Sequence, residues 1–345
     1  MNRYWTLAGG PLGPLPQPGD FRIVEAPTPS PGPGQALSRT LYVSLDPYQW
    51  GYRRTGVEKP GAVCHARTVS QVIESRMEGF APGDLVFNLN GWSEYGLMGE
   101  GIARPAYMIP RKLDPAQGRI SQAVGVLGML GLTAYAGMTL QGAPGASDSV
   151  VVSAASGGVG QIAGQLARLA GARVVGIAGK PDKLAYVVEE LGFDACVSHL
   201  SPTLAADLAA ACPAGVDVYF ENVGGAVFEA VLPLLNPGAR VTLCGVIAQY
   251  HDGAEQAGKA ALAQRLAPVS RHRGVIVHDL FVGDFVADHQ DRFLRQMGAW
   301  VASGQVRYRE DIRQGFEALP AVFGEMMRGA NFGKTLVLLS ADPTL

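Results

Sequence analysis

A glycine-rich turn contains the residues best suited to bind an anion. An apolar run, Ser149 to Ser153, precedes it and is typical of a parallel strand covered on both faces. Glycines then stand at Gly157, Gly158 and Gly160, where a side chain would hold a phosphate away from the backbone N–H groups. The helix expected to begin near Val159 directs its positive end to the same point. This pattern predicts a dinucleotide diphosphate site.

The context of the turn carries this prediction more than the glycines do. Ala155 replaces the first glycine of the usual G-x-G-x-x-G fingerprint. The match nevertheless follows a strand, opens an amphipathic helix that stops at Gly171, and leads to a second strand, Arg173 to Ala178. An ordinary glycine-rich turn would not require that succession.

The end of the second strand favours NADP(H) over NAD. NAD-binding proteins normally place Asp or Glu there to bind the adenosine ribose, whereas this chain has Gly179. Lys180 and Lys183 follow and would attract a 2′-phosphate. Alternatively, both are solvated charges on the first turn of a helix, where cations are slightly unfavourable.

Composition limits the class of protein. A chain of 345 residues suits two domains, and a net charge of −2 without a basic stripe argues against a nucleic-acid partner. Met1 to Gly10 show neither a signal peptide nor a membrane anchor, so a cytoplasmic enzyme with a small-molecule substrate is expected. The cysteines lie far apart, which argues against disulfides and a thiolate zinc site: Cys64, Cys196, Cys212 and Cys244.

The first part of the chain predicts an irregular β-rich lobe. Pro and Gly crowd the segment Leu12 to Gly34, which indicates loops and edge strands, and short strands are expected at 35–45, 69–74 and 84–88. A helical stretch of small residues begins near Ile120 and runs to Leu140. We place the domain boundary there, with one domain at 1–122 completed by 304–345 and the other at 123–303.

Strands and helices alternate in the second part, which predicts right-handed crossovers and a doubly wound parallel sheet. The expected helices are 181–191, 203–211, 226–235 and 285–302, and the expected strands are 194–197, 216–220, 239–244 and 275–282. The segment 331–339 is predicted to be a closing strand of the first lobe.

Several motifs, in order, resemble the medium-chain dehydrogenase/reductase superfamily over nearly the whole chain. Gly131-Leu-Thr-Ala-Tyr135 precedes the sheet, as in that superfamily. Five further motifs resemble its zinc-free branch of prostaglandin reductases, leukotriene B4 dehydrogenases and curcumin reductases: Asp46-Pro-Tyr48, Ala154-Ala-Ser-Gly-Gly-Val-Gly160, Glu221-Asn-Val-Gly-Gly225, Cys244-Gly-Val-Ile-Ala-Gln-Tyr250 and Asn331-Phe-Gly-Lys-Thr335.

The resemblance implies an α/β fold with a GroES-like β-rich catalytic domain and a doubly wound Rossmann cofactor domain. It also implies a homodimer that uses NADPH to reduce the carbon–carbon double bond of α,β-unsaturated ketones or aldehydes. Hydride would reach the β-carbon, and hydrogen bonds would stabilise the enolate. The superfamily's zinc motifs are missing, and Cys64-His65 is the only Cys-His neighbour pair, so no metal is expected.

Two tyrosines are candidate donors to the enolate oxygen, beside the cofactor's ribose hydroxyl. Motif position implies Tyr250, and Tyr48 is the second candidate. Each could instead be a packing residue at the end of a strand with a bonded hydroxyl. A phenol suits the role because a pKa of about 10 keeps its proton in place at neutral pH.

The resemblance also carries over the cofactor-binding residues. Asn222 and Asn331 have alternative roles as a turn former and a capping residue. The whole set lies on the glycine turn, beside the 2′-phosphate and near the nicotinamide: Gly157, Gly158, Val159, Gly160, Gln161, Lys183, His199, Asn222, Cys244, Gly245, Val246, Ile247, Tyr250, Leu280, Phe281, Val282 and Asn331.

The chain departs from the family at two places. His199 stands where a tyrosine is common; it can stack or donate to phosphate, and it puts the strength of the NADP preference in question. Gln49-Trp50 replaces the usual Met-Arg, so Trp50 and Tyr52 either shape the substrate pocket or belong to the core of the lobe.

Other functions remain open on this scaffold. An alcohol or carbonyl oxidoreductase or a quinone reductase would share the fold, because fold does not fix chemistry. A nucleotide-sensing protein without turnover would keep the cofactor cleft, although it would not need Tyr250. The natural substrate and the oligomeric state are not decided by the sequence, although strand 275–282 at a sheet edge could pair with a second copy.

Overall fold

Alternating apolar residues form the main sheet of the first unit, which comprises Met1–Gly128 and Glu310–Leu345. The computed structural model describes residues 1–248 and 255–345. The strand order is β14 (Glu310–Gln314), β15 (Lys334–Leu338), β3 (Gln35–Ser44), β4 (Thr68–Ser75), β5 (Leu85–Asn88) and β7 (Arg111–Lys112), and β6 (Tyr95–Gly99) also pairs with β3. The strands predicted at 35–45, 69–74 and 84–88 are confirmed, as is the closing strand within 331–339.

Two short elements flank this sheet at the beginning of the chain. β1 (Asn2–Leu7) and β2 (Phe21–Ala26) form a separate antiparallel pair, and β2 is the edge strand expected within the Pro- and Gly-rich segment. The core of the main sheet includes Leu41, Val69, Phe87 and Leu336, which the pairings of β15, β3, β4 and β5 bring together.

Two helices of the first unit were not predicted, α1 (Tyr48–Arg54) and α9 (Leu319–Met327). Tyr48 was expected at the end of a strand, but it begins α1, because Pro47 stands at the N-cap position with helical backbone angles. The same helix places Trp50 inside the core: its side chain is fully buried and its Nε1 donates to the Pro14 carbonyl over 2.9 Å. The core alternative is therefore correct for Trp50.

The second unit, Met129–Arg309, contains a parallel sheet in the doubly wound order. The strands follow one another as β10 (Ala195–Ser198), β9 (Arg173–Ala178), β8 (Ser149–Ser153), β11 (Val216–Glu221), β12 (Leu235–Leu243) and β13 (Ile276–Asp279), and every pairing is parallel. The order reverses between β8 and β11, and ligands of open α/β sheets bind outside the carboxyl ends of the strands at such a point. The predicted sheet and fold class are confirmed.

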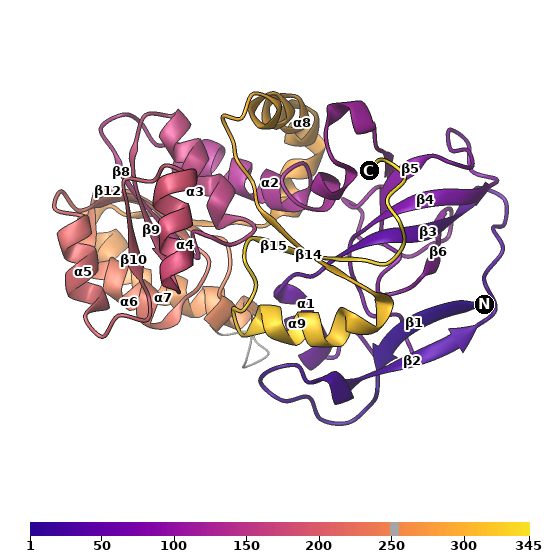
Figure 1. Ribbon diagram of the computed structural model, residues 1–345. Helices are drawn as coiled ribbons and strands as arrows, with labels where there is room; N and C mark the ends of the chain where they lie inside the picture. Colours follow the sequence, from indigo (N-terminus) through magenta and orange to yellow (C-terminus); the bar gives the residue numbers. More distant parts are fainter. Residues whose placement is uncertain (249–254) are drawn as a thin grey trace. The chain divides into compact units, whose positions relative to one another are not determined.

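Helices connect the strands of this sheet, and Figure 1 shows α3 (Gly160–Leu169) and α4 (Pro181–Ala185) over it. The others are α2 (Met129–Tyr135), α5 (Leu204–Ala211), α6 (Gly225–Val231), α7 (Glu255–Arg273) and α8 (Val286–Ala302). A π-helical segment continues α2 from Ala136 to Gly142, and another continues α4 to Glu190. Glycine is needed in the first of these, because a Cβ at Gly137 would lie 2.6 Å from Phe220 Cε2.

Three boundaries differ from those expected. β12 begins at Leu235 rather than 239, because its pairing with β11 shifts register between Val216 and Val218 and so recruits the preceding residues. The helix expected at 226–235 consequently ends earlier, at Val231, before a 3-10 turn. β13 ends at Asp279, short of the predicted 282. Within the described residues, no helix is long and apolar enough to cross a membrane.

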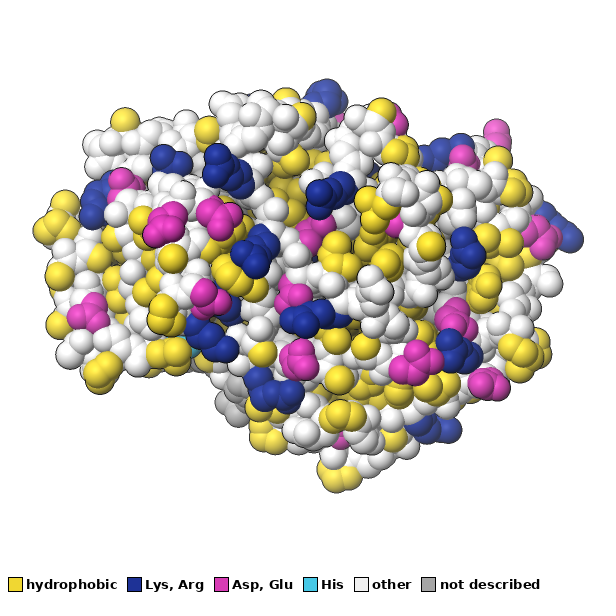
Figure 2. Space-filling model, viewed as in Figure 1, with side chains coloured by type: hydrophobic (Ala, Val, Ile, Leu, Met, Phe, Trp, Pro, Cys, Tyr) yellow, Lys and Arg dark blue, Asp and Glu magenta, His cyan; other side chains and the backbone are white. Residues whose placement is uncertain are grey.

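The surface carries both signs of charge. On the face shown in Figure 2, lysine and arginine side chains are interspersed with aspartate and glutamate. This agrees with the net charge of −2.

Candidate active site

The glycine turn after β8 has the geometry of an anion-binding cradle. Ala154 adopts a positive φ of 49°, and α3 begins at Gly160 directly after the turn. A Cβ at Gly160 would lie 2.2 Å from the Ala154 carbonyl oxygen, and one at Gly157 would lie 3.1 Å from the same atom. Both positions therefore favour glycine, and the N–H groups of the first turn of α3 point back to the turn. These residues fit a dinucleotide diphosphate.

The Gln161 side chain forms hydrogen bonds within the protein. Its Oε1 accepts from the Arg309 backbone N over 3.0 Å and from the Tyr186 hydroxyl over 2.8 Å, and its Nε2 donates to the Arg309 carbonyl over 3.2 Å. Gln165, one turn later, makes the equivalent pair of bonds with the backbone of Arg307. A contact between Gln161 and the diphosphate would thus come from its backbone.

The residues predicted for the 2′-phosphate come together after β9 and β10. The His199 backbone N donates to the Ala178 carbonyl over 2.8 Å, and a Cβ at Gly179 would lie 3.1 Å from His199 Nε2. Lys183 on α4 is near enough to affect the ring: partial burial and then the Lys183 charge hold the pKa of His199 below its usual value. A small residue, a lysine and an imidazole at this place fit a phosphate.

A buried carboxyl group organises the carboxyl ends of β8 and β11. Glu221 is fully buried and accepts from Ser153 Oγ over 2.9 Å, from Gly224 N over 3.0 Å, and also from Val223 N and the Tyr219 hydroxyl. Burial raises the pKa of Glu221. Sequence reasoning missed this residue as a site residue, although an acidic residue directly after a buried strand was a visible signal.

Asn222 is fixed across the point where the strand order reverses. Its backbone N donates to Ser153 Oγ and its Nδ2 to the Ser153 carbonyl, each over 2.7 Å. Its own carbonyl accepts from Ile247 N over 3.1 Å. Asn222 therefore joins β8 to the loop after β12 and presents backbone at the carboxyl edge of the sheet.

The backbone carbonyl of Glu221 fixes the start of the loop expected near the nicotinamide. The Glu221 carbonyl accepts from Cys244 N over 2.9 Å and from Gly245 N over 3.1 Å, and Val246 is fully buried. Tyr250, in the same predicted motif, lies outside the described residues.

A buried lysine fixes the segment after β13. Lys259 Nζ donates to Asp279 Oδ1 over 2.6 Å and to the Leu280 carbonyl over 3.0 Å. Leu280 is buried against Gly137, whereas the Phe281 side chain is 46% exposed and Val282 begins a 3-10 turn. Sequence reasoning did not single out Lys259, because only the fold brings α7 to this segment.

In the first unit, Tyr48 lies in a cluster of aromatic and imidazole rings. Its hydroxyl is 3.1 Å from His65 Nε2, and the Tyr52 ring packs edge-on with 5.1 Å between centroids. Burial raises the pKa of Tyr48 above its usual value. Burial, and then repulsion by Arg67, lower the pKa of His65 to about 4, so the imidazole is neutral at pH 7.

Three buried charged residues lie beneath this cluster. Asp46 Oδ2 is 2.9 Å from Arg67 Nη2, and Asp46 Oδ1 is 3.0 Å from Lys334 Nζ. Burial alone would raise the pKa of Asp46, but the two cations hold it well below its usual range. Asp46 thus remains a carboxylate. Neither Arg67 nor Lys334 was predicted as a site residue: Arg67 lies in no motif, and in the motif that contains Lys334 only Asn331 was expected at the site.

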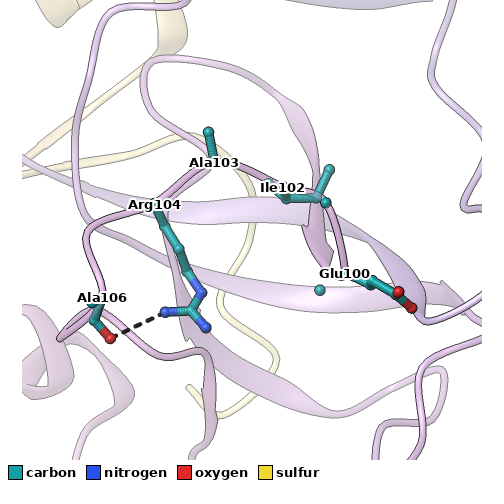
Figure 3. Close-up of a pocket in the computed structure, with 7 residues that line it drawn as sticks. Glu100, Ile102, Ala103, Arg104 and Ala106 are labelled. Atoms are coloured by element: carbon teal, nitrogen blue, oxygen red, sulfur yellow. Dashed lines mark hydrogen bonds between the residues drawn. The ribbon is translucent and has the colours of Figure 1, made fainter.

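Other predicted residues have local roles. Asn331 Nδ2 donates to the Gly333 carbonyl over 3.0 Å, which is the bond of a turn-forming residue. Cys64 is fully buried, and within the described residues no three His, Cys, Asp or Glu side chains lie together as a metal site. A shallow hollow of about 500 Å³ after β6 is lined by residues 99–104 and Ala106, and Arg104 Nη1 donates to the Ala106 carbonyl over 3.3 Å (Figure 3). It contains none of the predicted site residues.

Relatives and solved structures match almost the whole chain. Residues 3–103 match the family model described as "N-terminal domain of oxidoreductase", and residues 158–271 match that described as "Zinc-binding dehydrogenase". The chain is 39% identical to the NADPH-dependent curcumin reductase of Escherichia coli, over 99% of this chain and 98% of the relative. It is 34% identical to prostaglandin reductase 1 of Mus musculus, over 97% and 98%. The crystal structure of CurA from Vibrio vulnificus in complex with NADPH superposes with a TM-score of 0.86 at 36% identity, over 99% and 100%.

Proposed function

Since the chain belongs to the zinc-independent branch of the medium-chain dehydrogenase/reductase superfamily and is an NADP-dependent oxidoreductase, we propose that it reduces the carbon–carbon double bond of α,β-unsaturated ketones and aldehydes. The curcumin and prostaglandin reductases named above are its relatives over almost their full length. The natural substrate in this proposal is a small hydrophobic conjugated carbonyl compound.

One observation supports the cofactor part of the proposal most directly. Gly179, Lys183 and His199 lie together where an NAD-specific protein places a carboxylate. Their chemistry suits the 2′-phosphate of NADP(H), and the cradle at Gly157 and Gly160 suits the diphosphate. When bound, NADPH supplies the hydride for the β-carbon of the substrate.

The protein's own task is to stabilise the negative charge that develops on the substrate carbonyl oxygen. A tyrosine hydroxyl aimed at that oxygen lowers the barrier, because its hydrogen bond strengthens as the enolate forms. Tyr250 and Tyr48 are the proposed donors. The raised pKa of Tyr48 keeps its proton on the phenol at neutral pH, as a donor requires. If His65 Nε2 carries a proton, it donates to Tyr48 and leaves the phenol proton for the substrate.

The decisive experiment follows NADPH and NADH oxidation with a medium-chain enone, the matching saturated ketone and a quinone, and identifies the product. Consumption of NADPH with the enone, giving the saturated ketone, is the expected result. Activity on the saturated ketone or the quinone alone would assign the chain to carbonyl or quinone reduction instead. Tight NADPH binding with no turnover of any of the three would favour a sensing role.

We also propose that the protein is a homodimer through β13, the last strand of the parallel sheet. Ile276 on this strand is 51% exposed, and an uncovered edge strand is open to pairing with another chain. Light scattering should give twice the mass of the chain. Ile276→Lys should lower it to that of a monomer, because a charge on an edge strand opposes pairing.

A further inference from the structure

Arg67 is a buried cation whose hydrogen-bond donors the protein does not fully satisfy. Its side chain is 6% exposed, and within the described part of the chain its ion pair is with Asp46, through Nη2. Among the described residues, its Nε is buried without a hydrogen-bond partner. An unsatisfied buried donor on a charged group is costly, so its persistence suggests that a ligand completes the site.

Asp46 does not balance Arg67, because Lys334 shares it. Lys334 Nζ donates to Asp46 Oδ1, to the Leu45 carbonyl over 2.6 Å and to the Thr335 carbonyl over 3.1 Å. Three donated bonds require the ammonium form. Two buried cations therefore contact one carboxylate, and His65, being neutral at pH 7, adds no charge. Glu310 is a second carboxyl group that acts on Lys334, and burial raises its pKa. Arg67 thus shares its contacting carboxylate with Lys334.

Arg53 provides a contrast within the same unit. It is equally buried, but it pairs with its own carboxylate, Glu58, over 3.0 Å. Its guanidinium also lies within 5.4 Å of three core ring centroids, those of Phe21, Trp92 and Phe323. Arg53 Nη1 also lacks a hydrogen-bond partner among the described residues, but its guanidinium lies among these rings with a carboxylate of its own. The contrast with Arg67 is therefore in the surroundings and in the shared carboxylate.

The surroundings of Arg67 are different, because half-buried side chains lie around it. Its guanidinium carbon is 5.6 Å from the centroid of the Tyr48 ring. Its charge also acts on the pKa of Tyr107 and of His65, so these groups are near neighbours. All three side chains are partly exposed rather than enclosed in the core.

We propose that Arg67 binds a carboxylate of the substrate close to the carbonyl that faces Tyr48, so that conjugated keto acids are preferred over neutral enones. The proposal rests on the proposed double-bond reduction and narrows its substrate class. A guanidinium is suited to a carboxylate because its planar N–H groups form short, charged hydrogen bonds. The short separation of Arg67 from Tyr48 calls for a carboxylate only a few bonds from the ketone.

The test uses the full chain and two enones that differ only in charge. One carries a carboxylate two methylene groups from the ketone carbonyl, and the other is its methyl ester. We expect wild type to favour the acid in kcat/KM and Arg67→Met to lose about 10- to 100-fold on the acid with little change on the ester. The kcat/KM of Arg67→Lys on the acid should lie between those of wild type and Arg67→Met, because lysine keeps the charge but lacks the planar guanidinium. Arg76→Met, at an exposed arginine, is the matched control.

An equal acid-to-ester ratio in wild type and Arg67→Met would overturn the proposal while leaving double-bond reduction intact. If wild type reduced neither enone, the proposed function would be wrong instead. Calorimetry on wild type with NADP⁺ and the saturated keto acid gives a readout that does not need turnover or a folded variant. The acid should bind at least about 10-fold more tightly than its methyl ester, and equal affinities would refute the role of Arg67.

Discussion

The two candidate binding regions are built from different parts of the chain. In the second unit, backbone geometry makes the cradle: Gly157 and Gly160 remove side chains, and the carbonyl of Glu221 holds the next loop. In the first unit, buried side chains form the candidate site: Asp46 pairs with Arg67 and Lys334, and Arg67 lies against the Tyr48 ring. A backbone cradle suits a ligand that many proteins share, whereas a side-chain cluster can differ between close relatives. We therefore expect changes in the first region to alter substrate choice and changes in the second to alter cofactor affinity.

The largest expected effect concerns Tyr250, the donor that the family motif implies. Tyr250→Phe should lower turnover of an enone by about 10²- to 10³-fold if its hydroxyl stabilises the enolate. Steady-state kcat with saturating NADPH measures this, and Tyr48→Phe in the same assay apportions the role between the two units. An unchanged rate in Tyr250→Phe would transfer the role to the ribose hydroxyl or to Tyr48.

A single methyl group in the cradle should disrupt cofactor binding. In Gly160→Ala the new Cβ would lie 2.2 Å from the Ala154 carbonyl oxygen, so the turn must shift. We expect the Kd for NADPH, measured by fluorescence titration, to rise by about 100-fold, since overpacking costs up to about 3 kcal/mol. Gly145→Ala is the control, because nothing lies within 4 Å of its new Cβ. Equal affinity in the two variants would contradict the backbone cradle.

The Lys183 charge should affect the binding of NADPH but not of NADH, because only NADPH carries the 2′-phosphate. Lys183→Ala should weaken NADPH binding by about 10- to 100-fold through the loss of a charged hydrogen bond, and should leave NADH binding unchanged. NADH is thus the internal control in the same titration. An equal loss for both cofactors would show that Lys183 is structural.

The smallest effect is a pH dependence of stability in the first unit. The unfolded chain binds a proton at His65 near pH 6.5, but the folded protein does so only near pH 4. The unfolded state therefore gains the proton first, and the free energy of unfolding falls as the pH drops from about 6.5 to about 4. Over this pH range the free energy of unfolding should fall by about 2 kcal/mol less in His65→Gln than in wild type. Urea unfolding at pH 7 and pH 4.5 measures it, with His272→Gln, at an exposed position, as the control. An identical slope in wild type and His65→Gln would argue against the lowered pKa.

The sequence revealed the second region more completely than the first. Gly157, Gly160 and the strand–helix–strand around them follow one another within thirty or so residues, so local spacing was enough. Lys183 was predicted as a cation following the second strand, and His199 through the family resemblance. Both stay predictions as phosphate ligands, although the structure brings them close together. Glu221 was not predicted as a site residue, because the sequence does not show that an acidic side chain at the end of a strand is buried.

The charged cluster of the first unit could not be read in the same way. In the sequence, Asp46 precedes α1 and Arg67 follows it, and this helix was not predicted because Pro47 and two glycines lie in or near it. Lys334 comes from β15, near the C-terminus. Their contact depends on the antiparallel pairings of β3 with β4 and β15, which no local pattern specifies. Where charges from distant segments share one buried carboxylate, only the tertiary structure shows that they meet.

The contribution of Lys334 also sets an order of events during synthesis. The second unit is one continuous segment, Met129–Arg309, and can fold as soon as it leaves the ribosome, because domains fold as units while the chain emerges. The first unit must wait for β15, which carries Lys334, before its sheet is complete. Until then Asp46 lacks one of its two cations. We therefore expect the second unit to form before the first, so a chain cut short before β15 should bind NADPH while its first unit remains unfinished.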